Sequence, residues 1–164
     1  MTTAVLIGGA NGAGKTTFAR SLVPLLHPGA AFLNADEVAW EGYAPLAAGR
    51  EVLRRLDACV AARAPFVLET TLSSRRYAAR VPAWRAAGYA VTLHFIEVPD
   101  ADFAVARVAR RVRAGGHDVP EPDVRRRYAR GLVLFGAAYK PVVDMWAHWR
   151  ATEEGYELVT DSAA

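Results

Sequence analysis

The sequence predicts an α/β fold, in which a doubly wound, mainly parallel five-stranded sheet has helices on both faces. Short apolar runs rich in β-branched residues alternate along the chain with segments of helical spacing, as in strands joined by crossover helices. A glycine-rich loop directly follows the first apolar run and precedes a helical segment, an arrangement typical of phosphate-binding folds. With 164 residues and 52% hydrophobic composition, the chain fits one domain, 1–164.

The expected elements follow in chain order. Five apolar runs are typical of buried strands, and they span 3–8, 31–34, 66–69, 89–98 and, more weakly, 156–160. Helical spacing predicts helices over 15–26, 45–63, 73–87 and 100–114, with more helix from about 122 to 150. Trp84, Trp146 and Trp149 fall in these helical patterns and are interpreted as core residues. Ligands of such folds lie beyond the carboxyl ends of the strands, so residues just after each strand are the candidates for a site.

The segment 9–17 reads Gly-Ala-Asn-Gly-Ala-Gly-Lys-Thr-Thr, a complete G-x-x-x-x-G-K-[ST] loop. Its glycines let consecutive backbone N–H groups point at phosphate oxygens. Lys15 would supply a point charge to the β- and γ-phosphates, and the Thr16 hydroxyl would complete the shell of a Mg²⁺ ion. A nucleoside triphosphate is therefore expected at Gly9, Ala10, Asn11, Gly12, Ala13, Gly14, Lys15, Thr16 and Thr17.

Asp36 follows the second predicted strand, in the run Asn34-Ala35-Asp36. Its carboxylate would face the same rim of the sheet as the γ-phosphate, where it could orient a substrate hydroxyl and accept its proton. The alternative is that Asp36 caps the turn that follows at Glu37 and Val38. Position alone leaves both open, and Asp36 is a candidate catalytic and substrate-binding residue.

The third predicted strand ends in an acid, Glu69, which is the form of a Walker B element. Its carboxylate would hold a water of the Mg²⁺ shell or bind the substrate, and hydroxyls follow it. Alternatively, Glu69 is a buried, paired acid and Ser73 caps a helix. Arg75 and Arg76 could meet an anionic substrate or remain solvated. The candidate metal residues are Thr16 and Glu69, and the candidate substrate-binding residues are Asp36, Glu69, Thr70, Thr71, Ser73 and Arg75.

A segment rich in glycine and proline, 115–122, joins two helices that carry arginines. In the first helix Arg107, Arg110 and Arg111 share the face opposite the apolar residues. This composition indicates a mobile lid over about 107–128. Its closure would bring arginines onto ATP, stabilise charge on the transferring phosphoryl group and exclude water. A solvated basic face or a nucleic-acid patch is the alternative.

Composition excludes some other classes of protein. No basic segment precedes the first apolar residues and no apolar stretch reaches about 18 residues, so we expect a cytoplasmic protein without membrane contact. The lone Cys59 cannot form an internal disulfide, and no His/Cys cluster predicts a tightly bound transition metal. The formal net charge of +3 decides nothing about nucleic acid, because an arginine bias also arises from GC-rich coding.

In their order along the chain, these elements resemble the small zeta-toxin-like P-loop kinases. The resemblance covers most of the chain, and the matching motifs are 9–17, 34–36, 66–77, 106–120 and 126–128. The L-S-G-G-Q signature of ABC ATPases and the N-K-x-D motif of guanine-specific GTPases are absent. The resemblance implies ATP and Mg²⁺ as cofactors, with Lys15, Asp36, Arg107 and Arg111 as catalytic residues. It also implies a small hydroxyl-bearing acceptor, such as a nucleotide sugar, and a small antitoxin protein as partner.

Two other functions stay open. The chain could be an ATP-binding toxin-like or regulatory module that transfers little phosphate. It could also be a polynucleotide 5′-hydroxyl kinase that places the lid arginines on a nucleic-acid backbone. Aromatic residues that would stack bases are not interleaved with those arginines, Tyr128 excepted, so nucleic acid is the weaker expectation.

Overall fold

The computed structural model describes residues 1–26 and 28–163, without the side chains of 23–26, and six strands within this part form one sheet. The strands are β1 (Thr2–Gly9), β2 (Ala31–Leu33), β3 (Phe66–Thr70), β4 (Tyr89–Glu97), β5 (Met145–Ala151) and β6 (Tyr156–Asp161). Their order across the sheet is β2-β3-β1-β4-β5-β6, and only β5 and β6 pair antiparallel. The expected doubly wound, mainly parallel sheet is confirmed, with one strand more than predicted.

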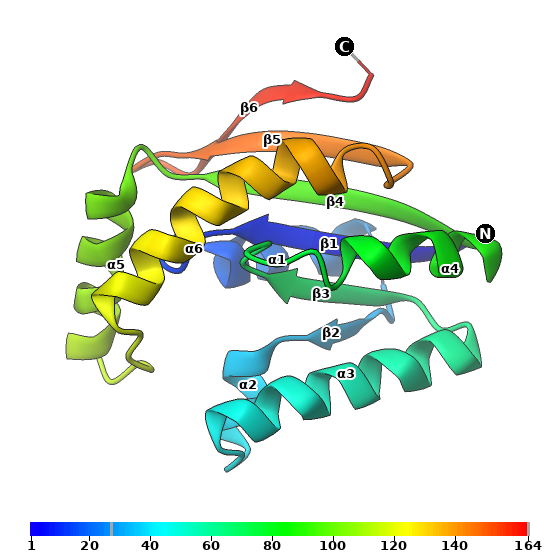
Figure 1. Ribbon diagram of the computed structural model, residues 1–164, viewed down its shortest axis with the longest axis horizontal. Coiled ribbons are helices and arrows are strands. Elements are labelled where there is room, and N and C mark those ends of the chain that lie inside the picture. The colour runs from blue at the N-terminus through cyan, green and yellow to red at the C-terminus, as the bar shows by residue number, and fades with distance from the viewer. Residues whose placement is uncertain (27, 164) are drawn as a thin grey trace.

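Helices cover both faces of this sheet (Figure 1). They are α1 (Lys15–Leu26), α2 (Ala35–Trp40), α3 (Pro45–Ala62), α4 (Val81–Ala86), α5 (Ala101–Arg113) and α6 (Glu121–Leu134). In Figure 1, α4 and α6 cross in front of the sheet and α1 lies behind it. None of the helices in the described part of the chain has the length and hydrophobicity needed to cross a membrane.

The two faces of the sheet have separate hydrophobic cores, because successive side chains of a strand point to opposite sides. Ala4 and Leu6 of β1 are buried in one core with residues of α3 and α4. Val5 and Ile7 are buried in a second core with residues of α1 and α5. This burial on both faces explains why the parallel strands read as continuous apolar runs.

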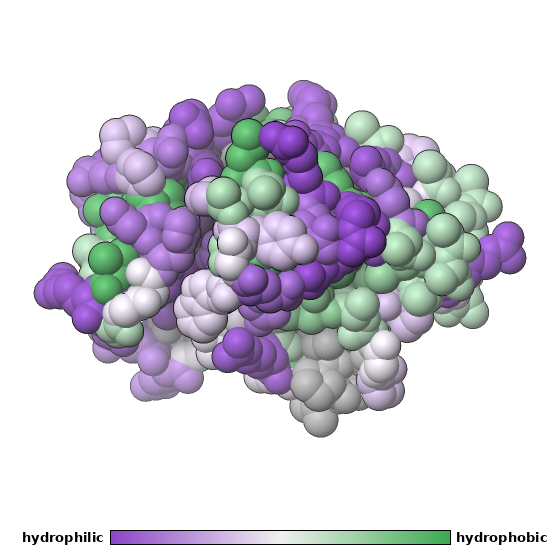
Figure 2. Space-filling model, turned by 90° about the horizontal axis from the view of Figure 1, so that it is seen from below, coloured by the Kyte–Doolittle hydropathy of each residue, from purple (hydrophilic) through white to green (hydrophobic). Residues whose placement is uncertain are grey.

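Helix α3 packs its apolar residues inward and buries one charged residue, Glu51, against two arginines. Val52 and Leu56 are buried in the first core. Glu51 accepts hydrogen bonds from Arg54 at 2.7 and 2.8 Å and from Arg55 at 2.8 Å. Figure 2 views the molecule from the side of α2 and α3 and shows hydrophilic residues over most of this face. Here Arg54 and Arg55, which lie far from the rim of the sheet, have carboxylate partners.

The helix expected from about 122 to 150 is wrong beyond Tyr139. Helix α6 ends at Leu134, a π-helical turn spans Phe135–Tyr139, and β5 then pairs in parallel with β4. Trp146 packs against the first core and Trp149 against the second. A spacing of three residues fits one helical face, but on a strand it places side chains on opposite faces. The tryptophans are therefore packed, as predicted, but from a strand.

The helix expected over 73–87 is also wrong in its first half. The chain is irregular from Thr71 to Tyr77, a 3₁₀ turn spans Ala78–Arg80, and α4 begins only at Val81. Pro82 lies in the first turn of α4, where its missing N–H is harmless, whereas a helix running through it would lose a hydrogen bond. The residues after β3 are thereby left free to line a cavity.

Candidate active site

The loop between β1 and α1 is built around glycines in the left-handed region. Gly12 and Gly14 have φ angles of 80° and 86°, which side-chain-bearing residues rarely adopt. A Cβ atom on Gly12 would stand 2.7 Å from the backbone oxygen of Ala104, and one on Gly14 would stand 2.7 Å from the Tyr156 hydroxyl. The loop therefore fits between α5 and β6 only because it lacks these side chains.

Three side chains converge on the carboxylate of Glu69 at the end of β3. Thr16 Oγ1 donates a hydrogen bond to Glu69 Oε2 at 2.8 Å, and Asn34 Nδ2 donates to the same oxygen at 2.9 Å. Lys15 Nζ lies 3.8 Å from Glu69 Oε1 and donates to the backbone oxygen of Ala10 at 2.9 Å. The two candidate metal residues, Thr16 and Glu69, are therefore in direct contact.

Burial acts on both members of the Lys15–Glu69 pair. It lowers the pKa of the Lys15 ammonium and raises the pKa of the Glu69 carboxyl, while the attraction between the two charges opposes both shifts. Only 7% of the Lys15 side chain and 9% of the Glu69 side chain are exposed. Two charges held this far from water are costly without a ligand, which is typical of a functional site.

The raised pKa of Glu69 predicts a pH-dependent stability. The folded state binds the Glu69 proton more tightly than the unfolded chain, so the unfolding free energy of the wild type should fall as pH rises from 4.5 through the raised pKa. Glu69→Gln lacks this proton, and its stability relative to the wild type should increase over that interval. Urea unfolding of both proteins without nucleotide, from about pH 4 to about pH 7, measures the difference. A difference that stays constant would contradict the raised pKa.

Asp36 lies in the first turn of α2 but does not cap it. The cap is Asn34, whose Oδ1 accepts a hydrogen bond from the backbone N–H of Asp36 at 2.8 Å. The alternative that Asp36 caps the turn at Glu37 is therefore wrong. The Asp36 side chain is 42% exposed and lies 3.4 Å from the guanidinium of Arg111. Its carboxylate is left available for a ligand.

Arg111 of α5 connects Asp36 to the loop before α6. One terminal nitrogen lies 3.4 Å from Asp36 Oδ2, and the other donates to the backbone oxygen of His117 at 2.8 Å. Its Nε is buried and has no hydrogen-bond partner in the described part of the chain. A phosphate oxygen would supply the missing acceptor.

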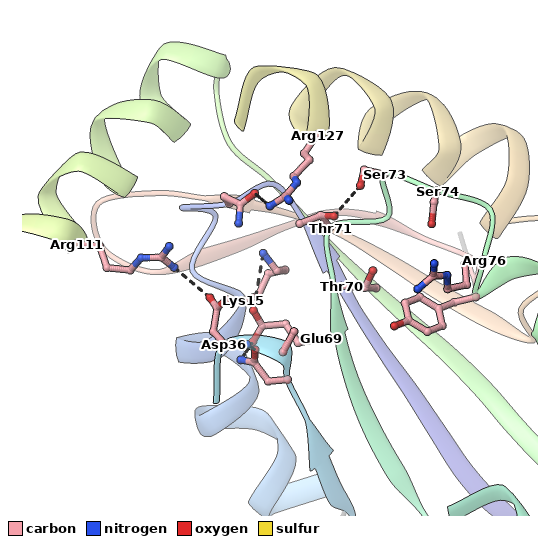
Figure 3. Close-up of a pocket in the computed structure, with 14 residues that line it drawn as sticks. Lys15, Asp36, Glu69, Thr70, Thr71, Ser73, Ser74, Arg76, Arg111 and Arg127 are labelled. Carbon is pink, nitrogen blue, oxygen red and sulfur yellow. Dashed lines mark hydrogen bonds and ion pairs between the residues drawn. The ribbon is translucent and has the colours of Figure 1, made fainter. Parts of the chain in front are cut away.

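Two cavities meet at this point. The first, which we call the loop cavity, has a volume of about 340 Å³ and lies between the phosphate loop and α5. Its lining residues are Gly12, Gly14, Lys15, Thr16, Thr17, Glu69, Arg107, Arg110, Arg111 and Ala114. The second, the Asp36 cavity, has a volume of about 330 Å³ and is drawn in Figure 3. Lys15, Glu69 and Arg111 line both, so a group bound between them is reached from either side.

The residues expected to bind a triphosphate do not all line the loop cavity. Gly12, Gly14, Lys15, Thr16 and Thr17 line the loop cavity, together with Arg107 and Arg111 from the expected lid. The remaining loop residues do not line it. Gly9, Ala10 and Ala13 are buried, and Asn11 lines the Asp36 cavity instead.

The residues expected to bind substrate gather in the Asp36 cavity with one exception. Asp36, Glu69, Thr70, Thr71 and Ser73 line it. Arg75 does not, because it lines a separate hollow with Ala129, Arg130, Val133 and Leu134. The adjacent Arg76 lines the Asp36 cavity in its place.

The turn after β3 explains how several hydroxyls reach one cavity. Leu72 is fully buried with a φ of 52°, a left-handed conformation that is strained for a residue with a branched side chain. Its neighbours Thr71 and Ser73 share a hydrogen bond of 2.9 Å between their hydroxyls. Such strain persists where surrounding packing fixes it, and here it lies beside the candidate site.

Four residues that shape the site lie outside the predicted site residues, although the sequence leaves Arg76 open as a contact for an anionic substrate. Asn34 holds Glu69, Arg76 and Arg127 line the Asp36 cavity, and Tyr156 contacts the phosphate loop. Arg127 donates to Asn11 Oδ1 at 3.1 Å, although 116 positions separate the two residues in the sequence. Asn34 could have been found as a capping residue just before Asp36, whereas Arg127 and Tyr156 carry no local signal.

Tyr156 should fix the phosphate loop. Its hydroxyl donates to the backbone oxygen of Gly14 at 2.7 Å, and its ring packs edge-on against Phe18 at 5.0 Å. Tyr156→Phe keeps the ring and removes the hydrogen bond, so we expect a loss of about 1 kcal/mol in unfolding free energy. ATP affinity should also fall. Urea unfolding and nucleotide titration test this, with Tyr128→Phe as control because its hydroxyl contact is 3.5 Å long. Equal behaviour of the two variants would contradict the role.

The loop cavity suits a magnesium–nucleotide complex. Glycines open the backbone, Lys15 and three arginines line the walls, and the Thr16 hydroxyl lies against a carboxylate. Mg²⁺ in such sites takes most of its ligands from phosphates and water, so one hydroxyl and one nearby acid suffice. Thr16 would bind the ion and Glu69 would hold one of its waters.

Known proteins are similar to this chain in sequence. The model of the AAA_33 family, described as an AAA domain, matches residues 5–130. An uncharacterized protein of Haemophilus influenzae is 27% identical over 134 residues, which are 76% of this chain and 91% of that protein.

Solved structures share the fold. A chain of the PezAT chromosomal toxin–antitoxin system of Streptococcus pneumoniae aligns with a TM-score of 0.72 and 18% identity, over 99% of this chain and 72% of that chain. A gluconokinase of Sinorhizobium meliloti aligns with a TM-score of 0.57 and 15% identity, over 93% of this chain and 83% of that chain. The fold is that of P-loop kinases, and the resemblance to the zeta-toxin-like group holds at this level.

Proposed function

The chain belongs to the AAA_33 family of AAA domains, and from this premise we propose that it is an ATP-dependent kinase for a small hydroxyl compound. The γ-phosphate of Mg·ATP would be transferred to that hydroxyl. One observation carries the proposal: a loop cavity suited to a triphosphate and a second cavity containing Asp36 meet at Lys15, Glu69 and Arg111. A donor and an acceptor bound in the two cavities would face each other there.

In the donor half, the protein supplies backbone and cationic contacts. The N–H groups of the phosphate loop and the N-terminus of α1 would bind the phosphate oxygens, with Lys15 on the β- and γ-phosphates. Bound Mg²⁺ would neutralise phosphate charge and orient the γ-phosphate. Glu69 and Asn34 hold Thr16 in place beside it. This positioning supplies most of what a kinase needs for catalysis.

In the acceptor half, Asp36 would orient the attacking hydroxyl and accept its proton. The hydroxyl oxygen forms a bond to the γ-phosphorus, the bond from that phosphorus to the β–γ bridging oxygen breaks, and ADP leaves. Arg111 would hydrogen-bond to the γ-phosphate during transfer, because its buried Nε lacks a partner and its guanidinium already contacts Asp36. Charge that develops in transfer would then lie between two cations, Lys15 and Arg111.

Residues 107–128 would act as the lid. They hold Arg107 and Arg111 on α5, the turn at Gly115, and the first half of α6 with Arg127. A hydrogen bond from Arg111 to the backbone oxygen of His117 holds the turn, so a movement of the turn would also move the arginine. Movement of this segment would admit nucleotide and then shield the transfer from water.

The test is transfer itself. The protein should convert Mg·ATP to ADP only when a suitable compound in a mixture of small alcohols and sugars becomes phosphorylated, as seen by mass spectrometry. The Asp36 cavity has a volume of about 330 Å³, a size typical of sites for small molecules. Phosphorylation of a 5′-hydroxyl oligonucleotide with no small acceptor would favour a polynucleotide kinase. Tight ATP binding with no acceptor of either kind would favour a regulatory module.

A further inference from the structure

We infer that the Asp36 cavity contains an anion-binding subsite formed by Arg76 and Arg127. The acceptor would therefore carry a phosphate or carboxylate group in addition to its reacting hydroxyl. This inference rests on the proposed kinase function and adds the chemical class of its substrate.

Both arginines line the Asp36 cavity, Arg76 away from the transfer point and Arg127 near enough to Lys15 to add to the effect of burial in lowering the pKa of that ammonium. Figure 3 shows Asp36, Lys15 and Glu69 together at one end of the cavity and Arg76 at the other. Arg127 reaches the cavity from α6, a different element from the one that carries Arg76. A molecule whose hydroxyl lies at Asp36 would extend its remaining groups toward these guanidinium groups.

Arg127 differs from its neighbours in the same helix. Arg125 pairs with Asp102 and Glu121, and Arg126 pairs with Asp123. The only hydrogen bond of Arg127 among the described residues is to the amide oxygen of Asn11, at 3.1 Å. A neutral amide leaves its charge uncompensated and most of its five donors unused.

Arg76 is similarly unpaired. It has no hydrogen bond or ion pair within the described part of the chain, whereas the nearby Arg80 pairs with Asp57. Ser73 and Ser74 also line the cavity, and Figure 3 shows Ser74 beside Arg76, where its hydroxyl can donate to an anion.

The acids of the cavity do not neutralise these two arginines. The charged residues that line it are Lys15, Asp36, Glu69, Arg76, Arg111 and Arg127, four cations against two anions. Asp36 is paired with Arg111, and Glu69 with Lys15. The excess charge is therefore that of Arg76 and Arg127, and guanidinium groups bind phosphate and carboxylate through paired hydrogen bonds.

Direct binding tests the subsite without catalysis. The loop cavity is first filled with a nonhydrolysable Mg·ATP analogue, and glycerol 3-phosphate, glycerate and glycerol are then titrated calorimetrically. The two anions should bind more tightly than glycerol. Arg76→Gln and Arg127→Gln should each weaken anion binding about tenfold, and Arg76→Gln should leave affinity for the analogue unchanged. Arg126→Gln is the matched control, because its side chain pairs with Asp123.

Three results would overturn the subsite. The first is equal affinity for glycerol and for both anions, and the second is undiminished anion binding in Arg76→Gln. Arg76 makes no hydrogen bond or ion pair among the described residues, so Arg76→Gln should fold like the wild type. A change in its anion binding would therefore report on the subsite itself. The third is a loss in Arg75→Gln instead, since Arg75 lines another hollow. Glycerol 3-phosphate and glycerate also distinguish phosphate from carboxylate as the bound group.

Transfer assays separate this inference from the function on which it rests. Neutral and anionic alcohols are compared as acceptors with Mg·ATP. Transfer to neutral alcohols alone would leave the kinase standing and remove the subsite. Anion binding that depends on Arg76 and Arg127, with no transfer to any small alcohol, would keep the subsite and remove the kinase.

Discussion

Replacing Asp36 by asparagine should lower kcat for phosphoryl transfer by about 10²–10⁴-fold while ATP affinity stays close to that of the wild type. Asparagine keeps the size of the side chain and can still contact Arg111, but it cannot accept the proton of the hydroxyl. The loss should therefore appear in kcat and not in nucleotide binding. Steady-state kinetics, together with calorimetric titration of an ATP analogue, provide the two measurements.

The neighbouring Glu37 offers a matched control for this substitution. It lies in the same turn of α2, but it pairs with Arg20 at 3.3 Å and lines neither cavity. Glu37→Gln should therefore transfer phosphate at nearly the wild-type rate. Equal turnover of Asp36→Asn and the wild type would show that Asp36 is not the base.

Lys15→Met should lower kcat by about 10²–10³-fold and also weaken ATP binding. The buried ammonium lies where the loop cavity and the Asp36 cavity meet, so it would contact the phosphoryl group both before and during transfer. Methionine fills similar volume without charge. Binding of an ATP analogue and single-turnover transfer measure the two effects separately.

Lys140 is the other lysine of the chain and serves as the control for Lys15. Its ammonium lies over the ring of Trp146, 3.7 Å from the centroid, and lines neither cavity. Lys140→Met should leave transfer unchanged. If Lys15→Met transfers phosphate as fast as Lys140→Met, the loop does not hold the phosphates as proposed.

Local sequence patterns were sufficient to predict most strands of the sheet. The run before the phosphate loop and the run before Glu69 are short and apolar, and they form β1 and β3 as predicted. The pattern failed for β5, where Trp146 and Trp149 are spaced as on a helix. Both faces of that strand pack against hydrophobic cores, so no polar alternation marked it as a strand.

The candidate site was predictable where its residues follow strands. Asp36 lies beyond the carboxyl end of β2 and Glu69 lies at the carboxyl end of the adjacent β3, and parallel pairing brings those ends together. Whether Asp36 capped its helix could not be decided from position, because Asn34 two residues earlier is an equally good cap. The hydrogen bond between Asn34 and the Asp36 backbone resolved it.

The sequence by itself determined the phosphate loop and the fold around it, because both depend on contiguous residues whose backbone freedom and polarity act locally. Only the tertiary structure decided which arginines line the Asp36 cavity. Arg76, and not Arg75, lines the Asp36 cavity, and Arg127 meets Asn11 from a position 116 residues away in the chain. The direction of a side chain on an irregular turn or a distant helix is set by packing between elements, and no local pattern encodes it.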